Sequence, residues 1–271
     1  MILNDTPVEI YGVQGIPVCV KREDLCCPDG PPFSKMRGIY QRLEKLKQQG
    51  IETIGYVETS ISMAGWGLAW LGDKLGLKVI IYDPQYVTDQ SVLENHRKMW
   101  KKYNAEIIPI KAGMACVNYN ICKKKLKQDF GNDAILLPLG LPFSETVDAT
   151  AKEFSKHQEY KSVVVNVGSG TICSGLVKGC VNKSVAIYGI MGRTGNVEKK
   201  KSGILKKSDR IGLYFNDLKF NLIDPGYEYT QAEIFPVPFP CNPYYDRKAW
   251  KWLNDYIDEL EQPILFWNIG A

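Results

Sequence analysis

Short apolar runs rich in β-branched residues alternate along this chain with longer segments of helical periodicity. Four runs in the first half have the length and composition of buried strands, at 53–57, 78–83, 105–110 and 134–139. Helices are predicted before and between them, at 36–49, 62–75, 89–103 and 116–130. Strands that alternate with helices pair in parallel, because each helix carries the chain back across the sheet. The alternation therefore predicts an α/β protein.

The alternation resumes after Pro142 and divides the chain into two domains. Further strands are predicted at 162–168, 185–192, 211–215 and 264–270, and further helices at 145–156, 174–181 and 246–260. The segment 42–145 is self-contained, so we expect a smaller α/β domain there and a larger, discontinuous domain formed by 1–41 and 146–271. Each domain is predicted to be an open, mostly parallel sheet covered by helices. Ligands of such folds bind beyond the carboxyl ends of the strands, so a bound cofactor is expected in the cleft between the domains.

The cysteines and histidines form no recognisable disulfide or metal pattern. The chain has eight cysteines and two histidines, and no two cysteines stand in a C-x-x-C pair. We therefore expect reduced, mostly buried thiols and no metal site. No apolar run approaches the ~20 residues that span a bilayer, and the N-terminus lacks the features of a signal peptide. A cytoplasmic protein without a membrane partner is expected.

Positive charge is concentrated in two segments, although the net charge of the chain is only +4. The first basic segment runs from 97 to 127, and the second runs from 199 to 207, where a loop is predicted. Solvated helix faces are the plainer interpretation of such clusters. The sharper interpretation is a surface for a polyanion such as nucleic acid. The sequence leaves both open.

The segment "VVVNVGSGTICSGL", 163–176, carries a predicted strand into a glycine turn and then into a helix. This glycine turn consists of Gly168, Ser169, Gly170 and Thr171. Glycines let the backbone curl so that amide N–H groups and a helix N-terminus converge on one anion, and the two hydroxyls add donors. The turn is therefore a candidate phosphate site. A tight turn with a helix cap is the alternative.

A second turn, in "ETSISMAGWGLAWLG" (58–72), also leads from a predicted strand into a helix. We call its residues 58–65 the serine-rich turn. Ser60, Ser62, Ala64 and Gly65 are expected to leave backbone amides open to a carboxylate or a phosphate. Capping of the helix by Ser60 or Ser62 is the alternative.

The segment "PPFSKMRGIY", 31–40, places Lys35 after a Pro-Pro pair and just before a predicted helix. This segment, "VKREDL" (20–25), the serine-rich turn and the glycine turn together resemble the tryptophan-synthase-β superfamily of pyridoxal-phosphate enzymes (fold type II). The resemblance implies that Lys35 forms the Schiff base with pyridoxal 5'-phosphate and that residues 168–171 hold the phosphate. It further implies a homodimer, and substrate binding by Ser60, Ser62, Met63, Ala64 and Gly65.

The C-terminal part of the chain narrows the resemblance. "NPYYDRKAWKWL" (242–253), "DPGYEYT" (224–230) and "LFWNIGA" (265–271) resemble elements of the 1-aminocyclopropane-1-carboxylate deaminase and D-cysteine desulfhydrase branch. Tyr245 and Tyr227 match the two active-site tyrosines of that branch, which implies that they handle protons or pack on the cofactor ring; because the chain has 15 tyrosines, a place in the core is the alternative for either. Asp246 falls where the branch places a glutamate against the pyridine nitrogen; capping of the following helix is the alternative.

Three positions depart from the pattern of the family. Met63 stands where an asparagine contacts the phenolic oxygen of the cofactor, and a methionine cannot donate a hydrogen bond there. Asn268 replaces the terminal histidine of the branch, and Thr171 replaces a glycine of the phosphate loop. The substrate of the branch therefore cannot simply be carried over to this chain.

The residues and the resemblance favour a pyridoxal-phosphate-dependent lyase or deaminase that activates the Cα of a small amino-acid substrate. A carboxylate at the ring nitrogen favours reactions that build negative charge at Cα, such as deamination, ring opening, racemisation or decarboxylation. A second hypothesis keeps the cofactor but places the amino acid on a polyanionic carrier such as modified DNA, in line with the basic segments. A third is a non-catalytic relative that retains the fold alone.

Overall fold

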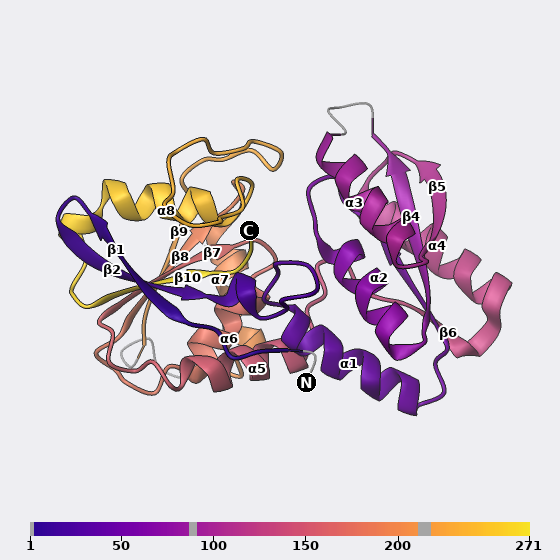
Figure 1. The fold of residues 1–271 in the computed structure, drawn as a ribbon, viewed down its shortest axis with the longest axis horizontal. Helices are drawn as coiled ribbons and strands as arrows, with labels where there is room; N and C mark the ends of the chain where they lie inside the picture. Colours follow the sequence, from indigo (N-terminus) through magenta and orange to yellow (C-terminus); the bar gives the residue numbers. More distant parts are fainter. Residues whose placement is uncertain (1–2, 87–90, 211–217) are drawn as a thin grey trace. The chain divides into compact units, whose positions relative to one another are not determined.

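The computed structural model describes residues 3–86, 91–210 and 218–271. The chain divides into two compact units, a large unit of Met1–Gly38 and Phe143–Ala271 and a small unit of Ile39–Pro142 (Figure 1). The domain boundaries expected from the sequence lie a few residues further along the chain at both crossings. Both units have helices on the faces of a mostly parallel sheet, which is the predicted fold class.

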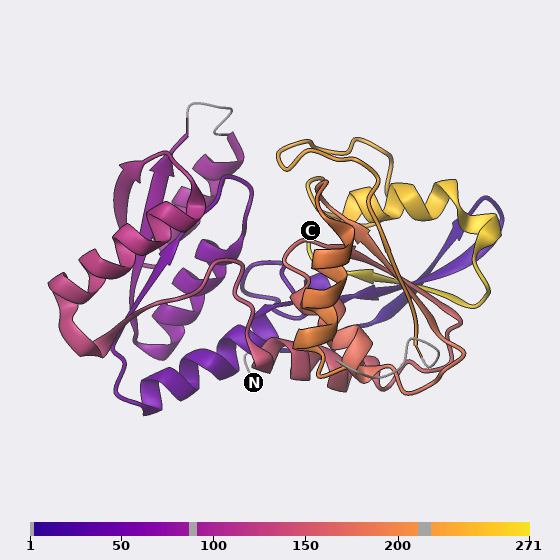
Figure 2. The same ribbon diagram turned by 180° about the vertical axis from the view of Figure 1, so that it is seen from behind.

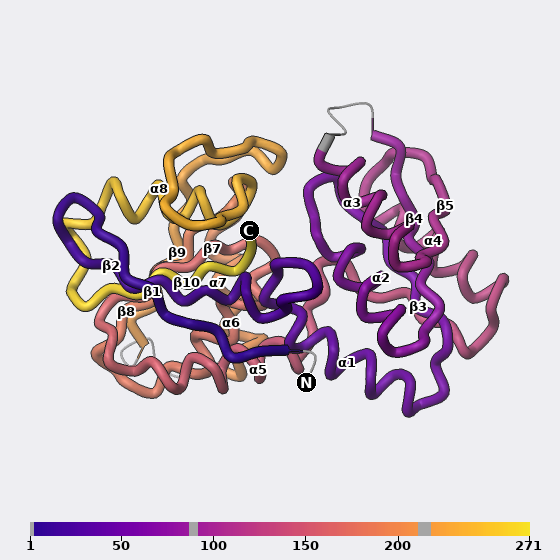
Figure 3. The backbone as a smooth tube through the Cα atoms, viewed as in Figure 1, coloured from indigo at the N-terminus to yellow at the C-terminus, as the bar shows by residue number. Residues whose placement is uncertain are grey.

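The large unit is built on a six-stranded sheet with the order β1-β2-β10-β7-β8-β9. Its strands are β1 (Val8–Val13), β2 (Ile16–Arg22), β7 (Ser162–Val167), β8 (Ala186–Met191), β9 (Lys219–Ile223) and β10 (Ile264–Asn268). β1 pairs antiparallel with β2, and all other neighbours are parallel. The C-terminal strand β10 therefore lies between β2, from the N-terminal segment, and β7 (Figure 3).

The strands β1, β2 and β9 are absent from the predicted strands, although the motif at 20–25 overlaps the end of β2; the predicted strand 211–215 lies outside the described residues. β1 is an edge strand that exposes part of its length, including Ile10, so it has no continuous apolar run. The turn between β1 and β2 is formed by Gln14 and Gly15, both with positive φ, as a two-residue hairpin requires. Glutamine rarely adopts a positive φ, so the sequence lacks the usual signal of a hairpin turn at this position.

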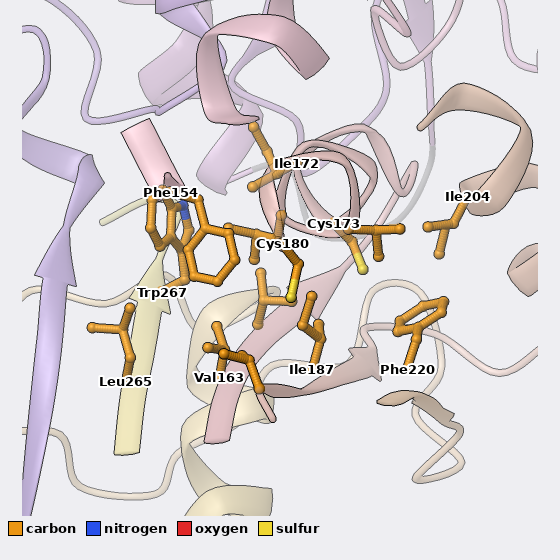
Figure 4. Packing of buried hydrophobic residues seen from close by; sticks show 14 of the residues in the cluster. Phe154, Val163, Ile172, Cys173, Cys180, Ile187, Ile204, Phe220, Leu265 and Trp267 are labelled. Atoms are coloured by element: carbon orange, nitrogen blue, oxygen red, sulfur yellow. The ribbon is translucent and has the colours of Figure 1, made fainter. Parts of the chain in front are cut away.

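Helices cover both faces of the large sheet (Figures 1 and 2). α5 (Ser144–Phe154), α6 (Thr171–Gly179) and α7 (Val197–Lys207) contribute to one core cluster, shown in Figure 4. α8 (Asp246–Asp255) contributes to the cluster on the other face. Successive side chains of β7 point to opposite faces of the sheet. Val163 and Val165 therefore pack in the first cluster and Val164 in the second.

The second basic segment is helical, so the predicted loop at 199–207 was wrong. α7 covers this segment, and the side chain of Asn196 accepts the backbone N–H of Lys199 at 2.8 Å as its N-cap. Lysine and leucine are good helix formers, and Ile204 anchors α7 in the core. The many lysines of this segment therefore suggested a loop, although α7 buries Ile204 on one side.

The small unit is built on a four-stranded parallel sheet with the order β5-β4-β3-β6. Its strands are β3 (Thr53–Val57), β4 (Lys78–Gln85), β5 (Glu106–Lys111) and β6 (Ala134–Leu136), of which β6 is shorter than predicted. α4 (Ala115–Phe130) packs Cys122 and Leu126 on one face. α2 (Ala64–Leu75) and α3 (Ser91–Lys102) lie on the opposite face (Figures 1 and 2).

The cysteines are all free, and six of the eight are buried. No described helix is both long and apolar enough to cross a membrane. The helix α1 (Met36–Gln48) begins directly after Lys35 and runs from the large unit into the small one.

Candidate functional site

The parallel strands of the large unit bring several predicted site residues to one edge of the sheet. β2, β10, β7 and β8 run in the same direction, so the residues after their carboxyl ends are neighbours. The glycine turn follows β7 at Gly168 and enters α6 at Thr171. Gly170 has a φ of +85°, and a Cβ there would lie 2.9 Å from Cγ1 of Ile204. Glycine at this position therefore allows both the conformation of the turn and the close approach of α7.

Lys35 lies beside the glycine turn. Its Nζ donates to Oγ of Ser169 at 3.0 Å, and that hydroxyl lies 3.0 Å from Oγ1 of Thr171. Burial, assisted by the positive charges of Lys207 and Lys200, lowers the pKa of Lys35 to about 8. The neutral amine, which attacks carbonyl carbons, is therefore accessible near physiological pH, as a catalytic role requires.

The segment that carries Lys35 is held from two sides. The backbone N–H of Ser34 donates to the carbonyl of Ile269, just beyond β10, at 2.9 Å. Arg37 donates twice to the carboxylate of Glu23, at 2.9 and 3.1 Å, and Glu23 is buried. The backbone bond of Ser34 and the ion pair of Arg37 with Glu23 thus help to fix the position of Lys35.

Asp246 is the first residue of α8 and is 1% exposed. Its carboxylate accepts the N–H of Ile269 at 2.9 Å and that of Gly270 at 3.1 Å. The N-cap of α8 is Tyr245, and the bonds given for the Asp246 carboxylate run to the residues after β10. Burial raises the pKa of Asp246 to about 8, against the opposing effect of the two amide donors. A positively charged N–H donor beside it would stabilise the ionised form.

The structure brings one of the two predicted tyrosines to the glycine turn. A Cβ on Gly168 would lie 3.6 Å from Cε1 of Tyr245, so this ring lies against the turn. The carbonyl of Tyr245 accepts Nδ2 of Asn166 at 2.8 Å, which ties the start of α8 to the end of β7. The hydroxyl of Tyr227 instead donates to Glu233 at 2.6 Å, and burial together with this bond raises its pKa.

The positions that depart from the family pattern are buried. Asn268, in place of the histidine, donates Nδ2 to Asp24 at 2.9 Å and to a backbone carbonyl at 3.0 Å, so it links β10 to the turn after β2. Thr171 is fully buried in the glycine turn. In the small unit, Met63 is buried just before α2, and Ser60 is half-buried in the serine-rich turn.

The serine-rich turn is closed by a carboxylate of its own. Glu58, which is 1% exposed, accepts the N–H of Thr59 at 2.8 Å and that of Gly65 at 2.5 Å. Oγ of Ser62 accepts the N–H of Ala64 at 3.1 Å. The expectation that Ala64 and Gly65 leave their amides open was therefore wrong, because an acidic side chain from the end of β3 turns onto the N-terminus of α2. Burial raises the pKa of Glu58 to about 8.

Two lysines of α7 contact the glycine turn and were not predicted as site residues. Nζ of Lys200 donates to the carbonyl of Gly168 at 2.8 Å, and Nζ of Lys207 donates to the carbonyl of Ser169 at 2.9 Å. Burial lowers the pKa of both lysines. Their spacing places them on one face of a helix, but the sequence does not reveal what that face contacts.

The residues of the large unit fit pyridoxal phosphate. A phosphate dianion needs hydrogen-bond donors and positive charge, and the glycine turn offers two hydroxyls, the N-terminus of α6 and three nearby ammonium groups. Lys35 supplies an amine for the cofactor aldehyde, and Asp246 supplies a buried carboxylate suited to a protonated pyridine nitrogen. Lys35 and residues 168–171 therefore form a consistent candidate cofactor site.

Sequence comparison points to the same cofactor. A family model described as pyridoxal-phosphate dependent enzyme matches residues 3–212. The glycyl-dTMP PLP-dependent decarboxylase of Pseudomonas phage M6 is 35% identical over 290 residues, and the match covers 100% of both chains.

Solved structures show the same fold. The crystal structure of a 1-aminocyclopropane-1-carboxylate deaminase homologue matches with a TM-score of 0.78 and 22% identity, over 99% of this chain and 90% of the other. A hydrogen sulfide-producing enzyme from Fusobacterium nucleatum matches with a TM-score of 0.69 and 16% identity, over 100% and 94%. At these identities the likeness establishes the fold alone, and the family follows from the sequence matches. The chain belongs to the pyridoxal-phosphate dependent enzyme family and has the architecture of fold type II.

Proposed function

We propose that this protein is a pyridoxal-phosphate-dependent decarboxylase that acts on an amino acid carried by a nucleotide, within modified DNA or free. The observation that carries the proposal is the 35% identity, over the full length of both chains, to a glycyl-dTMP PLP-dependent decarboxylase. The substrate must present a primary amino group and a carboxylate on the same carbon, because the cofactor bonds to the amine and activates the bonds of that carbon.

The closed serine-rich turn supports decarboxylation over reactions that retain the carboxylate. By resemblance, this turn holds the substrate carboxylate in other family members. Here the amides of Ala64 and Gly65 are already bonded to Ser62 and Glu58. Hydrogen bonds stabilise the charge of a carboxylate, and that charge disperses as CO₂ leaves, so strong binding of the carboxylate would slow its loss. A turn occupied by Glu58 avoids that penalty.

The residues of the large unit account for the remaining steps. When bound, pyridoxal phosphate supplies an electron sink for the pair left at Cα after the bond to the carboxylate breaks. CO₂ leaves, a proton replaces it at Cα, and the product is an amine, so no oxidant is needed. With a pKa of about 8, Lys35 can hold and deliver that proton. Asp246 would keep the ring nitrogen protonated, and residues 168–171 would hold the phosphate.

Surface charge supports a nucleotide carrier. Seven exposed lysines occur on two helices of the small unit: Lys98, Lys101 and Lys102 on α3, and Lys123, Lys124, Lys125 and Lys127 on α4. These helices lie on opposite faces of the sheet, so the first basic segment forms two surfaces rather than one (Figures 1 and 2). Either surface would attract the phosphates of a nucleic acid.

The proposal is tested by supplying glycine labelled at its carboxyl carbon in three forms: joined through Cα to thymidine in an oligonucleotide, on the mononucleotide, and free. We expect labelled CO₂ and an amine product from a nucleotide-linked form, and none with the Lys35→Ala variant. Release of ammonia with the label retained would assign the protein to the deaminases instead. CO₂ from free glycine alone would remove the nucleotide from the proposal.

A further inference from the structure

One face of α7 lies on the glycine turn. Lys200, Ile204 and Lys207 follow the i, i+4, i+7 spacing that places side chains on one side of a helix. Ile204 is fully buried, and its Cγ1 would lie 2.9 Å from a Cβ on Gly170. The lysines on either side of it bond to carbonyls of the turn. The contact is therefore a packed interface with a hydrogen bond at each end.

The bonds of the two lysines determine how the peptide groups of the turn are oriented. In a trans peptide, the carbonyl oxygen and the N–H of the following residue point in opposite directions. Lys200 holds the carbonyl of Gly168, so the N–H of Ser169 points away from that ammonium group. Lys207 holds the carbonyl of Ser169, so the N–H of Gly170 points away as well. Carbonyl oxygens thus lie on the α7 side of the turn and amide donors on the other.

We propose that Lys200 and Lys207 are positioning residues of the phosphate site: they orient the Ser169 and Gly170 amides toward the cofactor phosphate and offset its negative charge. Without them, either peptide group can turn a carbonyl oxygen toward the anion, which replaces an attraction with a repulsion. The proposal rests on the cofactor of the family and on the glycine turn as its phosphate site. It does not depend on the proposed substrate, and its test uses no substrate.

The test compares the affinity of the full-length protein for pyridoxal phosphate and for pyridoxal, which lacks the phosphate. Cofactor is removed with hydroxylamine, and each compound is titrated back by visible absorbance. We expect the double variant Lys200→Met/Lys207→Met to lose affinity for pyridoxal phosphate by about tenfold or more, because two positive charges near the phosphate and the orientation of its amide donors are lost together. Its affinity for pyridoxal should fall much less, because only the raised pKa of Lys35, an effect common to both compounds, acts on it. The matched control, Lys199→Met/Lys206→Met, removes two exposed lysines from the same helix and should behave as wild type.

An equal loss of affinity for both compounds would mean that the lysines do not act on the phosphate in particular. No loss of affinity for pyridoxal phosphate would mean that they do not act on the phosphate at all. Either result overturns the proposal. The pair Lys200→Arg/Lys207→Arg retains charge and donors, so it should recover at least part of the selectivity for the phosphate. A drop in DNA affinity with unchanged cofactor affinity would assign the lysines to a nucleic acid instead. Should the double variant fail to fold, the ³¹P resonance of the bound cofactor in each single variant gives the answer, because an unshifted resonance contradicts the proposal.

Discussion

The backbone N–H of Ile269 donates to the carboxylate of Asp246 at 2.9 Å. The carbonyl of Ile269 accepts the N–H of Ser34, the residue before Lys35, also at 2.9 Å. One residue after β10 thus connects the predicted partner of the ring nitrogen to the predicted cofactor anchor, although the two lie near opposite ends of the chain. Substitutions at Asp246 therefore test both its chemistry and its support of Lys35.

The variant Asp246→Asn should retain the cofactor but lower the turnover number by about a hundredfold or more, in the range of a lost catalytic proton-handling group. Asparagine keeps one acceptor for the amides of Ile269 and Gly270 but cannot hold a proton on the ring nitrogen. The turnover number and the visible absorbance are measured on the same preparation. Unchanged turnover would leave Asp246 with a structural role alone.

Asp246→Ala removes every acceptor and should in addition lower the free energy of unfolding by about 1–3 kcal/mol.

The amine of Lys35 should titrate near pH 8 in the cofactor-free protein, because its pKa is lowered from 10.5 to about 8. A lowered pKa means that the neutral, reactive form appears at lower pH than in an ordinary lysine. The rate of reaction with an amine-selective acylating reagent, followed at Lys35 by peptide mass spectrometry, should rise to half its maximum near pH 8. Removal of the nearby charges in Lys200→Met/Lys207→Met should move this midpoint upward. A midpoint near 10.5 in the wild type would contradict the environment described for Lys35.

The buried ion pair between Lys21 of β2 and Glu153 of α5 should stabilise the large unit in a pH-dependent way. The two side chains meet at 2.6 Å and are nearly fully buried. Burial raises the pKa of Glu153, but hydrogen bonds from Lys156 and Lys21 outweigh it and hold the pKa at about 2, below the ordinary 4.5. A lowered folded-state pKa gives stability that is present above pH 4.5 and is lost as the pH falls toward 2.

Glu153→Gln should therefore cost about 3–5 kcal/mol in the free energy of unfolding at neutral pH, because Lys21 is left buried without its partner. Urea unfolding at neutral pH and again near pH 3 should show this difference shrinking as the pH falls. Lys156→Gln removes the half-exposed partner of the same carboxylate and should cost under about 1 kcal/mol. A difference that grows in acid would contradict the assigned pKa.

DNA binding, if the carrier is a nucleic acid, should weaken steeply with salt, since each neutralised phosphate contributes a slope of about −0.9 in log affinity against log salt. α3 and α4 lie on opposite faces of the small sheet, so one duplex can meet only one of them. We expect only one of two triple variants, Lys98/Lys101/Lys102→Gln or Lys123/Lys124/Lys127→Gln, to flatten the slope. Binding without salt dependence, or equal effects of both variants, would argue against a duplex on a basic helix.

The sequence predicts the interior of the fold better than its edges. The strands β3, β4, β7, β8 and β10 are largely buried in parallel sheets, and their β-branched runs are visible in the sequence, as is the run of the partly exposed edge strand β5. β1 is an edge strand with exposed positions, and α7 presents many lysines, so neither has the pattern that marks a buried element. In both cases the packing partner, rather than local propensity, determines the structure.

The candidate site follows the same division. Lys35 and residues 168–171 belong to short local motifs, and the structure brings them together. Glu58, Lys200 and Lys207 form hydrogen bonds to backbone groups. Such bonds cannot be predicted from the residue type alone. The hydroxyl of Tyr227 donates to Glu233, a partner that residue type alone does not reveal, and its role in the active site stays a prediction.

Borohydride reduction of the purified protein tests the central claim most directly. The protein reconstituted with pyridoxal phosphate should absorb in the visible, lose that band on reduction, and carry the cofactor covalently on Lys35 in a peptide digest. Lys35→Ala should give neither the band nor the labelled peptide. A label fixed on any other lysine, Lys200 or Lys207 included, would contradict the assignment of Lys35 as the cofactor anchor.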